Sequence, residues 1–333
     1  MIAADSIFHK ICNKYNLGEL VDVPAQLTGG LMHRMYSLFT EKGKYAVKML
    51  NPYVMQRESA MSNYRTAETL ERILEKRNIP ILAALSFDGQ KMLEIDGQYF
   101  YLFDWFDGTA LRDGEITEYH CREIGKALAG IHQIDCGQQD IPESSLREEI
   151  HIDWDFYLRR MQDENRELYE LLRQTESIIY ESQEQGNAVI KKLPQILAIC
   201  HNDMDSKNVL WKGQDYRIID LECLSYANPA LEMYELALCW SGYYSCQIDF
   251  HLFREFIGAY LAAGGVKTQD WAVLYDSNNG RLEWLEYNVK RVLGIECGAD
   301  EKEMGISQVR NTLAQIKYYY EIKETMIASL SDF

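Results

Sequence analysis

The sequence predicts an α+β fold of two lobes, a β-rich amino-terminal lobe with one main helix and a larger, mostly helical carboxyl-terminal lobe. The chain has 333 residues, more than one small domain usually holds, and 47% of them are hydrophobic. Strand-like segments dominate before Gly108, and helical spacing dominates after it. We therefore predict a first lobe at 1–104, a hinge at 105–109 and a second lobe at 110–333.

The first lobe is expected to begin with a helix over residues 6–15, where apolar residues recur on one side. The sequence then turns β-rich after Gly18. Three strands are predicted, at about 21–27, 35–40 and 45–50. The last two are joined by a short segment that contains Gly43, which is typical of a hairpin turn.

A second helix is predicted at about 55–77, because this stretch lacks Gly and Pro and spaces its apolar residues by three or four. Such a helix would pack on a sheet. Pro80 should end it, since proline cannot continue the helical hydrogen bonds. Two further strands are expected near 91–94 and 99–104.

The second lobe is expected to be chiefly helical. Its predicted helices lie at about 116–134, 153–184, 230–245, 250–263, 280–294 and 306–328. A small β element around 198–220 is the exception. The prediction is therefore one helical lobe with a short β insertion.

The charge of the chain limits its partners. With 51 acidic and 34 basic residues the formal net charge is -17, which argues against nucleic-acid binding. The stretch 135–186 holds 14 acidic residues and five arginines but no lysine. This acidity would attract a cationic substrate, although solvated helix faces explain it equally well.

The cysteines and apolar runs indicate a cytoplasmic protein. Eight cysteines are scattered without a CxxC pair or a metal-ligand spacing, as expected for reduced thiols. The apolar runs are too short for a membrane span. The first residues also lack the basic and apolar regions of a signal peptide.

A polar segment, His201-Asn202-Asp203-Met204-Asp205-Ser206-Lys207-Asn208, precedes an apolar approach to Asp220. Asp203 and Asn208 have the spacing at which one tight loop aims a carboxylate at a hydroxyl and an amide oxygen at Mg²⁺. Asp220 adds a charged oxygen, and Mg²⁺ prefers such ligands. We predict Asp203 as the base of a phosphoryl transfer, with Asn208 and Asp220 as Mg²⁺ ligands.

Two neighbours of these residues are less decided. We interpret His201 as a scaffold that hydrogen-bonds the loop rather than as a catalyst. Glu222 could bind the metal or brace the loop, and both roles remain open. An ordinary polar turn is the alternative for the whole segment.

These residues resemble the aminoglycoside phosphotransferase and choline kinase superfamily, relatives of protein kinases that phosphorylate hydroxyls of small molecules. The resemblance spans nearly the whole chain. It implies a protein-kinase-like two-lobed fold and ATP or GTP as the phosphoryl donor. One departure is Asn202, where Gly is common in the family.

The resemblance also covers the first lobe. Thr28, Gly29 and Gly30 are similar to the short nucleotide loop of the family, and Lys48 to its strand-three lysine. Alternation along the strand lets Lys48 project into a nucleotide cleft. The family holds this lysine with a glutamate of the next helix, which implies Glu68, with Glu71 as the rival.

The segment before Gly108 resembles the hinge of the family. There the backbone of Phe103, Asp104 and Trp105 would meet the adenine edge, while the aromatic side chains are core. His132, near the end of a helix that resembles one beneath the catalytic loop, is expected to be structural.

The sequence thus predicts a Mg²⁺-dependent kinase of a small hydroxylated molecule, such as an aminoglycoside-like antibiotic, a choline-like amino alcohol or a sugar. The alternative is a non-catalytic binding or structural protein, similar to the kinase-like spore-coat proteins of this superfamily. The joint presence of Lys48, Asp203, Asn208 and Asp220 favours catalysis. Candidate acceptor-binding segments are 240–244, 284–287 and the acidic stretch, but the acceptor stays open.

Overall fold

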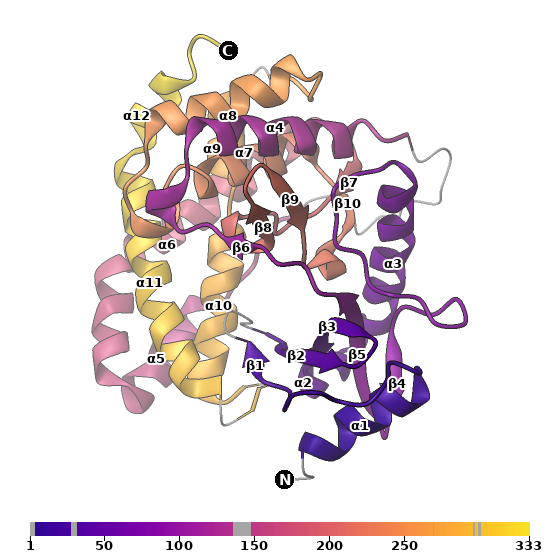
Figure 1. Cartoon of the computed structure of the whole chain (residues 1–333). Coiled ribbons are helices and arrows are strands. Elements are labelled where there is room, and N and C mark those ends of the chain that lie inside the picture. Colours follow the sequence, from indigo (N-terminus) through magenta and orange to yellow (C-terminus); the bar gives the residue numbers. More distant parts are fainter. Residues whose placement is uncertain (1–3, 28–31, 136–147, 269, 296, 299–300) are drawn as a thin grey trace. The chain divides into compact units, whose positions relative to one another are not determined.

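The structure of the chain is a computed structural model that describes residues 4–27, 32–135, 148–268, 270–295, 297–298 and 301–333 (Figure 1). The chain forms two compact units. One comprises Met1–Leu111 with Lys207–Leu224, and the other comprises Arg112–Ser206 with Ser225–Phe333. The first unit is therefore built from two separate stretches of sequence.

A five-stranded antiparallel sheet, in the order β1-β2-β3-β5-β4, forms the centre of the first unit. Its strands are β1 (Gln26–Leu27), β2 (Arg34–Thr40), β3 (Gly43–Met49), β4 (Leu93–Ile95) and β5 (Gln98–Asp104). The tight turn between β2 and β3 sets Thr40 opposite Gly43, and this register sets Lys48 opposite Met35. Tyr101 of β5 lies on the other side of Lys48.

Helices cover both faces of this sheet. They are α1 (Ala4–Lys14), α2 (Pro52–Met55) and α3 (Ala60–Lys76). Ile11 of α1 packs with Val47 and Phe100 on one face, and Tyr64 of α3 packs with Tyr101 on the other. Since side chains alternate along a strand, Lys48 projects on the side of α3.

The returning stretch Lys207–Leu224 adds a small sheet to the first unit. β6 (Thr109–Ala110), β8 (Val209–Lys212) and β9 (Asp215–Ile218) pair in the order β6-β8-β9. Ile218 exchanges backbone hydrogen bonds with the segment after α3, donating to Pro80 and accepting from Leu82, both at 2.8 Å. These bonds place the end of β9 beside the large sheet.

The second unit is mostly helical. Its helices are α4 (Glu118–His132), α5 (Trp154–Glu164), α6 (Arg166–Val189), α7 (Pro229–Cys239), α8 (Phe250–Ala262), α9 (Trp271–Ser277), α10 (Gly280–Leu293), α11 (Lys302–Glu321) and α12 (Lys323–Ser329). Short 3₁₀ helices are η1 (Asp113–Glu115), η3 (Ile190–Lys192), η4 (Ser206–Asn208), η5 (Leu221–Cys223) and η6 (Tyr243–Ser245), of which η5 lies in the first unit and η4 spans the boundary. A two-stranded sheet pairs β7 (Ala198–Cys200) with β10 (Ser225–Ala227).

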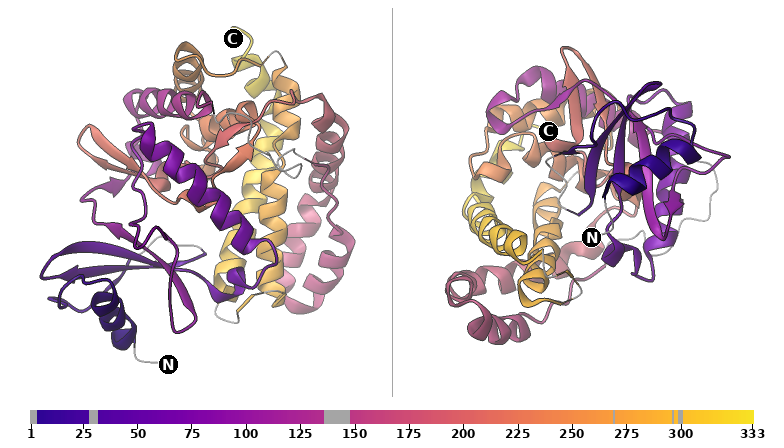
Figure 2. Two further views of the ribbon diagram at one scale, coloured as in Figure 1. Left: turned by 90° about the vertical axis from the view of Figure 1, so that its right-hand side faces the viewer. Right: turned by 60° about the horizontal axis from the view of Figure 1, so that its bottom comes forward.

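Helices α5, α6, α10 and α11 lie side by side in both views of Figure 2. Apolar side chains of all four form one core, with Met161, Leu172, Leu285 and Leu313 among its members. Packing in this core fixes the position of α10 within the second unit.

The predicted protein-kinase-like fold is confirmed, but several element boundaries differ. The expected strand at 21–27 is reduced to β1, with a single bridge at Leu20. The expected helix at 153–184 is two helices, because the Asn165 side chain accepts a hydrogen bond from Leu168 N–H and starts α6. The short helix α9 was not predicted, since seven residues give too little periodicity.

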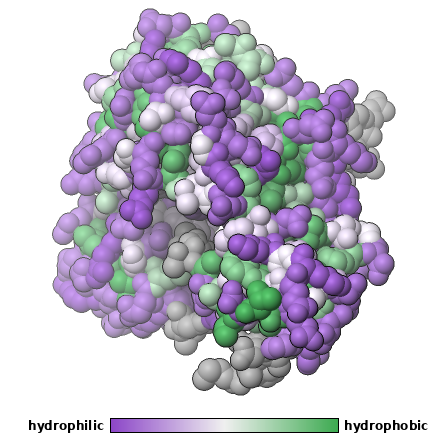
Figure 3. All heavy atoms as spheres, in the orientation of Figure 1, coloured by the Kyte–Doolittle hydropathy of each residue, from purple (hydrophilic) through white to green (hydrophobic). Residues whose placement is uncertain are grey.

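Hydrophilic side chains cover much of the face shown in Figure 3, which agrees with the high charge of the chain. Within the described residues, no helix has both the length and the apolar character that crossing a membrane requires.

Candidate active site

The loop that carries Asp203 lies in the second unit and is held by hydrogen bonds at nearly every residue. His201 is fully buried, and its Nδ1 accepts from the backbone N–H of Asp203 at 3.3 Å. Trp240 Nε1 donates to the carbonyl of Met204 at 2.9 Å. Tyr244 OH donates to Asp205 Oδ2 at 3.1 Å. These hydrogen bonds hold the loop in one conformation.

The buried carboxylate of Glu232, in α7, also binds this loop. Its Oε1 accepts from the backbone N–H of Asn202 at 2.5 Å, and its Oε2 lies 2.7 Å from His132 Nε2. Tyr260 OH accepts from Val266 N–H and lies 2.8 Å from His132 Nδ1. The Tyr260 hydroxyl can then donate its own proton to Nδ1, so we assign the ring proton of His132 to Nε2. The network links the loop to three helices.

The charges of this network are balanced inside the protein. Burial alone would raise the pKa of Glu232, but the bonds from His132 and Asn202 outweigh it, and the pKa is lowered. Cys200 Sγ also lies within 4.8 Å of the donor atoms of His132 and Glu232. Burial raises the pKa of this thiol, so it stays protonated and is a poor metal ligand. We interpret the cluster as structural.

Asn202 adopts a left-handed backbone conformation with φ of 63°. Its side chain compensates by donating to the carbonyl of Cys200 at 3.2 Å and to Ser225 Oγ at 3.0 Å. Asn tolerates this conformation better than other non-Gly residues. This explains how the chain accommodates Asn at a position where Gly is common.

Lys48 is buried in the first unit and contacts two carboxylates of the returning stretch. Its Nζ lies 2.5 Å from Asp220 Oδ1 and also contacts Glu222 Oε1. Burial alone would lower the pKa of Lys48, but the two carboxylates outweigh it and raise the pKa. Burial raises the pKa of Glu222 to about 8, with Lys48 opposing this rise and Asp220 adding to it.

The backbone of Asp220 has an unusual conformation. Asp220 has φ of 65° and ψ of 53°, a left-handed conformation that is uncommon outside Gly. One residue earlier, Ile219 N–H donates to the carbonyl of Asn208 at 2.9 Å. Asn208 and Asp220 are therefore held close together, as a shared metal would need. Backbone outliers of this kind are frequent at functional sites.

His33 connects this group to the start of β2. Its Nδ1 accepts from the backbone N–H of Asn51 at 3.0 Å, so the neutral ring carries its proton on Nε2. Nε2 lies 3.1 Å from Tyr64 OH and 3.4 Å from Glu222 Oε1. Burial, together with the nearby Lys48 charge, lowers the pKa of His33 to about 3. A neutral donor therefore faces Glu222.

The glutamates of α3 have other partners in this structure. Glu68 Oε1 accepts from Met92 N–H at 2.9 Å and from Tyr101 OH at 3.1 Å. Glu71 pairs with Lys91 and accepts from Ala84 N–H. Among the residues that the structure describes, neither glutamate forms an ion pair with Lys48, which is held by Asp220 and Glu222 instead.

The predicted hinge continues β5. Phe103 lies opposite Ala46, and Trp105 N–H donates to the carbonyl of Lys44 at 3.0 Å. In antiparallel pairing, alternate residues turn their backbone groups toward and away from the partner strand. The N–H and carbonyl of Asp104 therefore point away from β3. The predicted nucleotide loop, Thr28 to Gly30, lies outside the described residues.

Comparison with known proteins now decides the family. A family model described as "Phosphotransferase enzyme family" matches residues 25–276. The chain belongs to this phosphotransferase family. Among curated proteins, no match is found.

Solved structures similar to this phosphotransferase-family chain share its fold at low identity. A spectinomycin phosphotransferase solved with ADP and spectinomycin is 16% identical, with a TM-score of 0.64 and 98% of each chain covered. An ethanolamine kinase from Plasmodium vivax is 16% identical, with a TM-score of 0.59, 92% of this chain and 86% of that chain covered. An amicoumacin kinase solved with AMP-PNP and Ca²⁺ is 13% identical, with a TM-score of 0.57 and coverages of 95% and 96%.

Sequence reasoning missed two residues of this candidate site, His33 and Glu232, and it named Tyr244 for the acceptor but not for its contact with the loop. Glu232 and Tyr244 contact the loop from more than 25 positions away, and no local pattern reveals such contacts. One signal existed for Glu232, because α7 is otherwise largely apolar on its buried side. A buried carboxylate there needs a partner.

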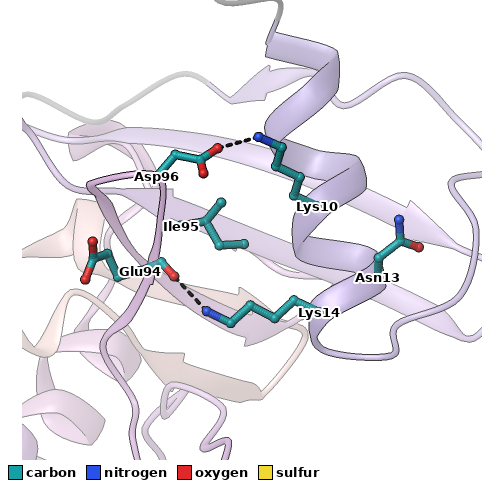
Figure 4. A pocket seen from close by; sticks show the side chains of 6 residues that line it. All are labelled: Lys10, Asn13, Lys14, Glu94, Ile95 and Asp96. Carbon is teal, nitrogen blue, oxygen red and sulfur yellow. Dashed lines mark hydrogen bonds and ion pairs between the residues drawn. The ribbon is translucent and has the colours of Figure 1, made fainter.

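An open hollow of the first unit lies apart from these residues. It lies between α1 and the β4–β5 hairpin and is lined by Lys10, Asn13, Lys14 and Glu94–Asp96 (Figure 4). Lys10 pairs with Asp96, and Lys14 donates to the carbonyl of Glu94. Lys48, Glu68 and Phe103–Trp105, the predicted nucleotide-contacting residues that the structure describes, do not line it, and its polar groups hold α1 to the hairpin.

Two substitutions at Asn202 test the backbone conformation of the loop. Asn202→Val should lower the free energy of unfolding by about 2 kcal/mol, because a β-branched residue strains the left-handed conformation and both side-chain hydrogen bonds are lost. Asn202→Gly loses the bonds but not the conformation, so a loss of about 1 kcal/mol is expected. Urea unfolding measures both, and equal losses would contradict the assigned strain.

Replacing His33 by Gln should change how stability depends on pH. The folded pKa of about 3 lies below the unfolded value, so His33 binds a proton more readily in the unfolded chain. The wild type should therefore lose stability as the pH falls below about 6.5, at up to about 1.4 kcal/mol per pH unit from this group. His33→Gln should lack this part of the slope, whereas His9→Gln, at an exposed position of α1, should keep it. Parallel urea-unfolding curves from pH 6.5 to 4.5 would contradict the assignment.

Proposed function

We propose that this chain transfers the γ-phosphate of ATP or GTP to a hydroxyl group of a small molecule, with Mg²⁺. The observation that supports this most is the buried contact of Lys48 with Asp220 and Glu222. It gathers one cation and two hard oxygen donors on the end of β9 and the neighbouring β3. Phosphoryl transfer needs such a group, because its main requirement is charge neutralisation.

The donor atoms fit Mg²⁺. Carboxylate oxygens of Asp220 and Glu222 and the amide oxygen of Asn208 are hard ligands of the kind that Mg²⁺ takes in small number. Burial raises the pKa of Glu222, so its negative charge is costly without a second cation. Asp220, Asn208 and Glu222 would hold the ion, which would supply charge neutralisation at the phosphates when bound. Lys48 would then be shared between these carboxylates and the nucleotide.

The nucleotide base would meet the end of β5. Asp104 is the hinge residue whose backbone N–H and carbonyl point away from β3, so these two groups suit an adenine or guanine edge. Phe103 and Trp105 use their backbone groups within the sheet. Glu68 stays a candidate for holding Lys48 when nucleotide is present.

Asp203 would act as the base. In the reaction, the bond from the γ-phosphorus to the bridging oxygen breaks, a bond to the acceptor oxygen forms, and the hydroxyl proton passes to the Asp203 carboxylate. The hydrogen bonds of His201, Trp240 and Glu232 would fix the loop so that this carboxylate needs no reorganisation.

A nucleotide-consumption screen tests this proposal. ATP and GTP are each supplied with Mg²⁺ and with single acceptors, including aminoglycosides, choline, ethanolamine, homoserine, methylthioribose and other sugars. We expect at least one acceptor to raise turnover above the water background, and chelation of Mg²⁺ to abolish it. If the chain binds no nucleotide at millimolar Mg²⁺, the proposal of catalysis is wrong. The result would then favour a non-catalytic binding or structural protein with this fold.

A further inference from the structure

Buried polar atoms without a hydrogen-bond partner gather around the turn from α9 to α10. Among the described residues, such atoms include Ser277 Oγ, Asn279 Oδ1 and Arg281 Nε at this turn, and Tyr243 OH of η6. Ser277 is fully buried, and Tyr243 is only 8% exposed. Since buried polar groups are normally paired, a cluster of this kind offers hydrogen bonds to a polar ligand or to ordered water.

Arg281 and Tyr243 meet at one aromatic ring. The Arg281 guanidinium lies 3.7 Å from the centroid of the Tyr319 ring, and the Tyr275 ring stacks on Tyr319 at 4.2 Å. These two groups must occupy opposite faces of Tyr319. Tyr243, 6.1 Å away and nearly perpendicular, therefore lies at the rim of the ring. Burial raises the pKa of Tyr243 and the Arg281 charge opposes this, so the two groups are within electrostatic reach.

Arg281 is partly buried, and its buried Nε has no hydrogen-bond partner. Its Nη1 donates to the carbonyl of Asn278, and among the described residues it forms no ion pair. Arg291, on the same helix, shows the usual solution: its Nε donates to Glu301 Oε2 at 2.9 Å. Arg281 is also the second residue of α10, where the helix dipole disfavours a cation. A bound anion would pair with the Arg281 guanidinium and would also interact favourably with the helix dipole.

This group adjoins the loop of Asp203 within the second unit. Tyr244, the neighbour of Tyr243, donates to Asp205, two residues after Asp203. The rings of Tyr243 and Tyr244 are 5.9 Å apart. A chain of direct contacts therefore runs from the loop through η6 to Tyr319 and Arg281, on the acceptor-binding side of the predicted reaction.

We propose that Arg281 and Tyr243 bind a carboxylate group of the phosphoryl acceptor, so that the acceptor is a hydroxylated carboxylic acid. This rests on the proposed function. The guanidinium Nε and the Tyr243 hydroxyl would each donate to a carboxylate oxygen, and both are unpaired now. Glu283 lies in the same first turn of α10, and its negative charge would repel a bound anion. A singly charged carboxylate is repelled less than a phosphate and therefore fits better. The proposal replaces the cationic acceptor that the acidity of the chain suggests.

Pairs of acceptors that differ only in the carboxylate test the proposal. Suitable pairs are L-serine with ethanolamine, glycerate with glycerol, and homoserine with 3-aminopropan-1-ol. For at least one pair, we expect kcat/KM of the acid to exceed that of its partner by at least about 10-fold, as one charge-assisted hydrogen bond would give. If the partners without a carboxylate are used equally well or better, the proposal is wrong.

Variants separate binding from folding. Tyr243→Phe removes a hydroxyl that has no hydrogen-bond partner, so the melting temperature should stay unchanged while KM for the acid rises about 10-fold. Arg281→Gln should remove the preference for the acid, and Arg281→Lys should keep part of it. Arg310→Gln, at an exposed pair of α11 with Glu167, is the charge-matched control. Equal effects of Arg281→Gln and Arg310→Gln, or no effect of Tyr243→Phe on KM, would overturn the assignment.

A binding measurement is independent of turnover. Sodium acetate should raise the melting temperature of the wild type more than sodium chloride of equal ionic strength, and Tyr243→Phe and Arg281→Gln should lose this difference. Specific stabilisation by acetate without any nucleotide turnover would leave the anion site standing and refute the proposed kinase. Turnover without stabilisation by acetate, and without preference for acids, would refute the anion site alone.

Discussion

Asp203→Asn is expected to lower turnover by about 100- to 10,000-fold, the usual contribution of a general base. The amide has nearly the shape of the carboxylate but cannot accept the hydroxyl proton. The loop should keep its conformation, because the backbone N–H groups of Asn202 and Asp203 and the carbonyl of Met204 hold it through hydrogen bonds that the substitution leaves in place. Steady-state kinetics with the acceptor identified by the screen measure the loss.

The control for this substitution is Asp215→Asn, which makes the same change of charge at an exposed site of β9. It should leave turnover within about twofold, since surface changes of this kind have small effects. The KM for the nucleotide should change little in either variant, because Asp203 is assigned to the acceptor and not to the nucleotide. A variant Asp203→Asn that keeps more than a fifth of the wild-type turnover would refute Asp203 as the base.

Glu232→Ala should be the most destabilising single change in the second unit, with an expected loss of about 3–5 kcal/mol in the free energy of unfolding. It leaves the buried His132 ring and the N–H of Asn202 without their shared acceptor. Glu232→Gln should lose less, because the amide oxygen can still accept from Asn202. Urea unfolding followed by tryptophan fluorescence measures each loss.

Glu184→Ala provides the control, at an exposed position of α6 in the same unit, and should change stability by no more than about 0.5 kcal/mol. Turnover offers a second readout. Even the folded fraction of Glu232→Ala should turn over more slowly, since the loop of Asp203 loses its attachment to α7. If Glu232→Ala and Glu184→Ala are equally stable, the buried network is not what holds the loop.

Local patterns were sufficient for much of the first unit. The β2–β3 hairpin follows from a short turn with Gly43 and from strand residues on either side, and it sets the register and the facing side of Lys48. Asn165 shows a limit of the same approach. Helical spacing continues through it, and its role as the start of a new helix depends on a side-chain hydrogen bond that periodicity does not contain.

Partners of buried charges were harder to predict. Lys48 was expected to pair with Glu68 from α3, yet the structure pairs it with Asp220 and Glu222, more than 170 residues away along the chain. Either Glu68 or the pair Asp220 and Glu222 can neutralise the charge of Lys48. Only the position of β9 beside the large sheet, held by Pro80 and Leu82, brings the second pair of carboxylates into reach.

By itself, the sequence determined the fold class, most of the strands and longer helices, and the candidate residues for phosphoryl transfer, because these depend on neighbours within a few positions. The tertiary structure decided which buried groups lie together: Lys48 with Glu222, and Glu232 with His132. The physical reason is that a buried charge must be compensated by whatever group the fold places within a few ångströms, at any distance along the chain.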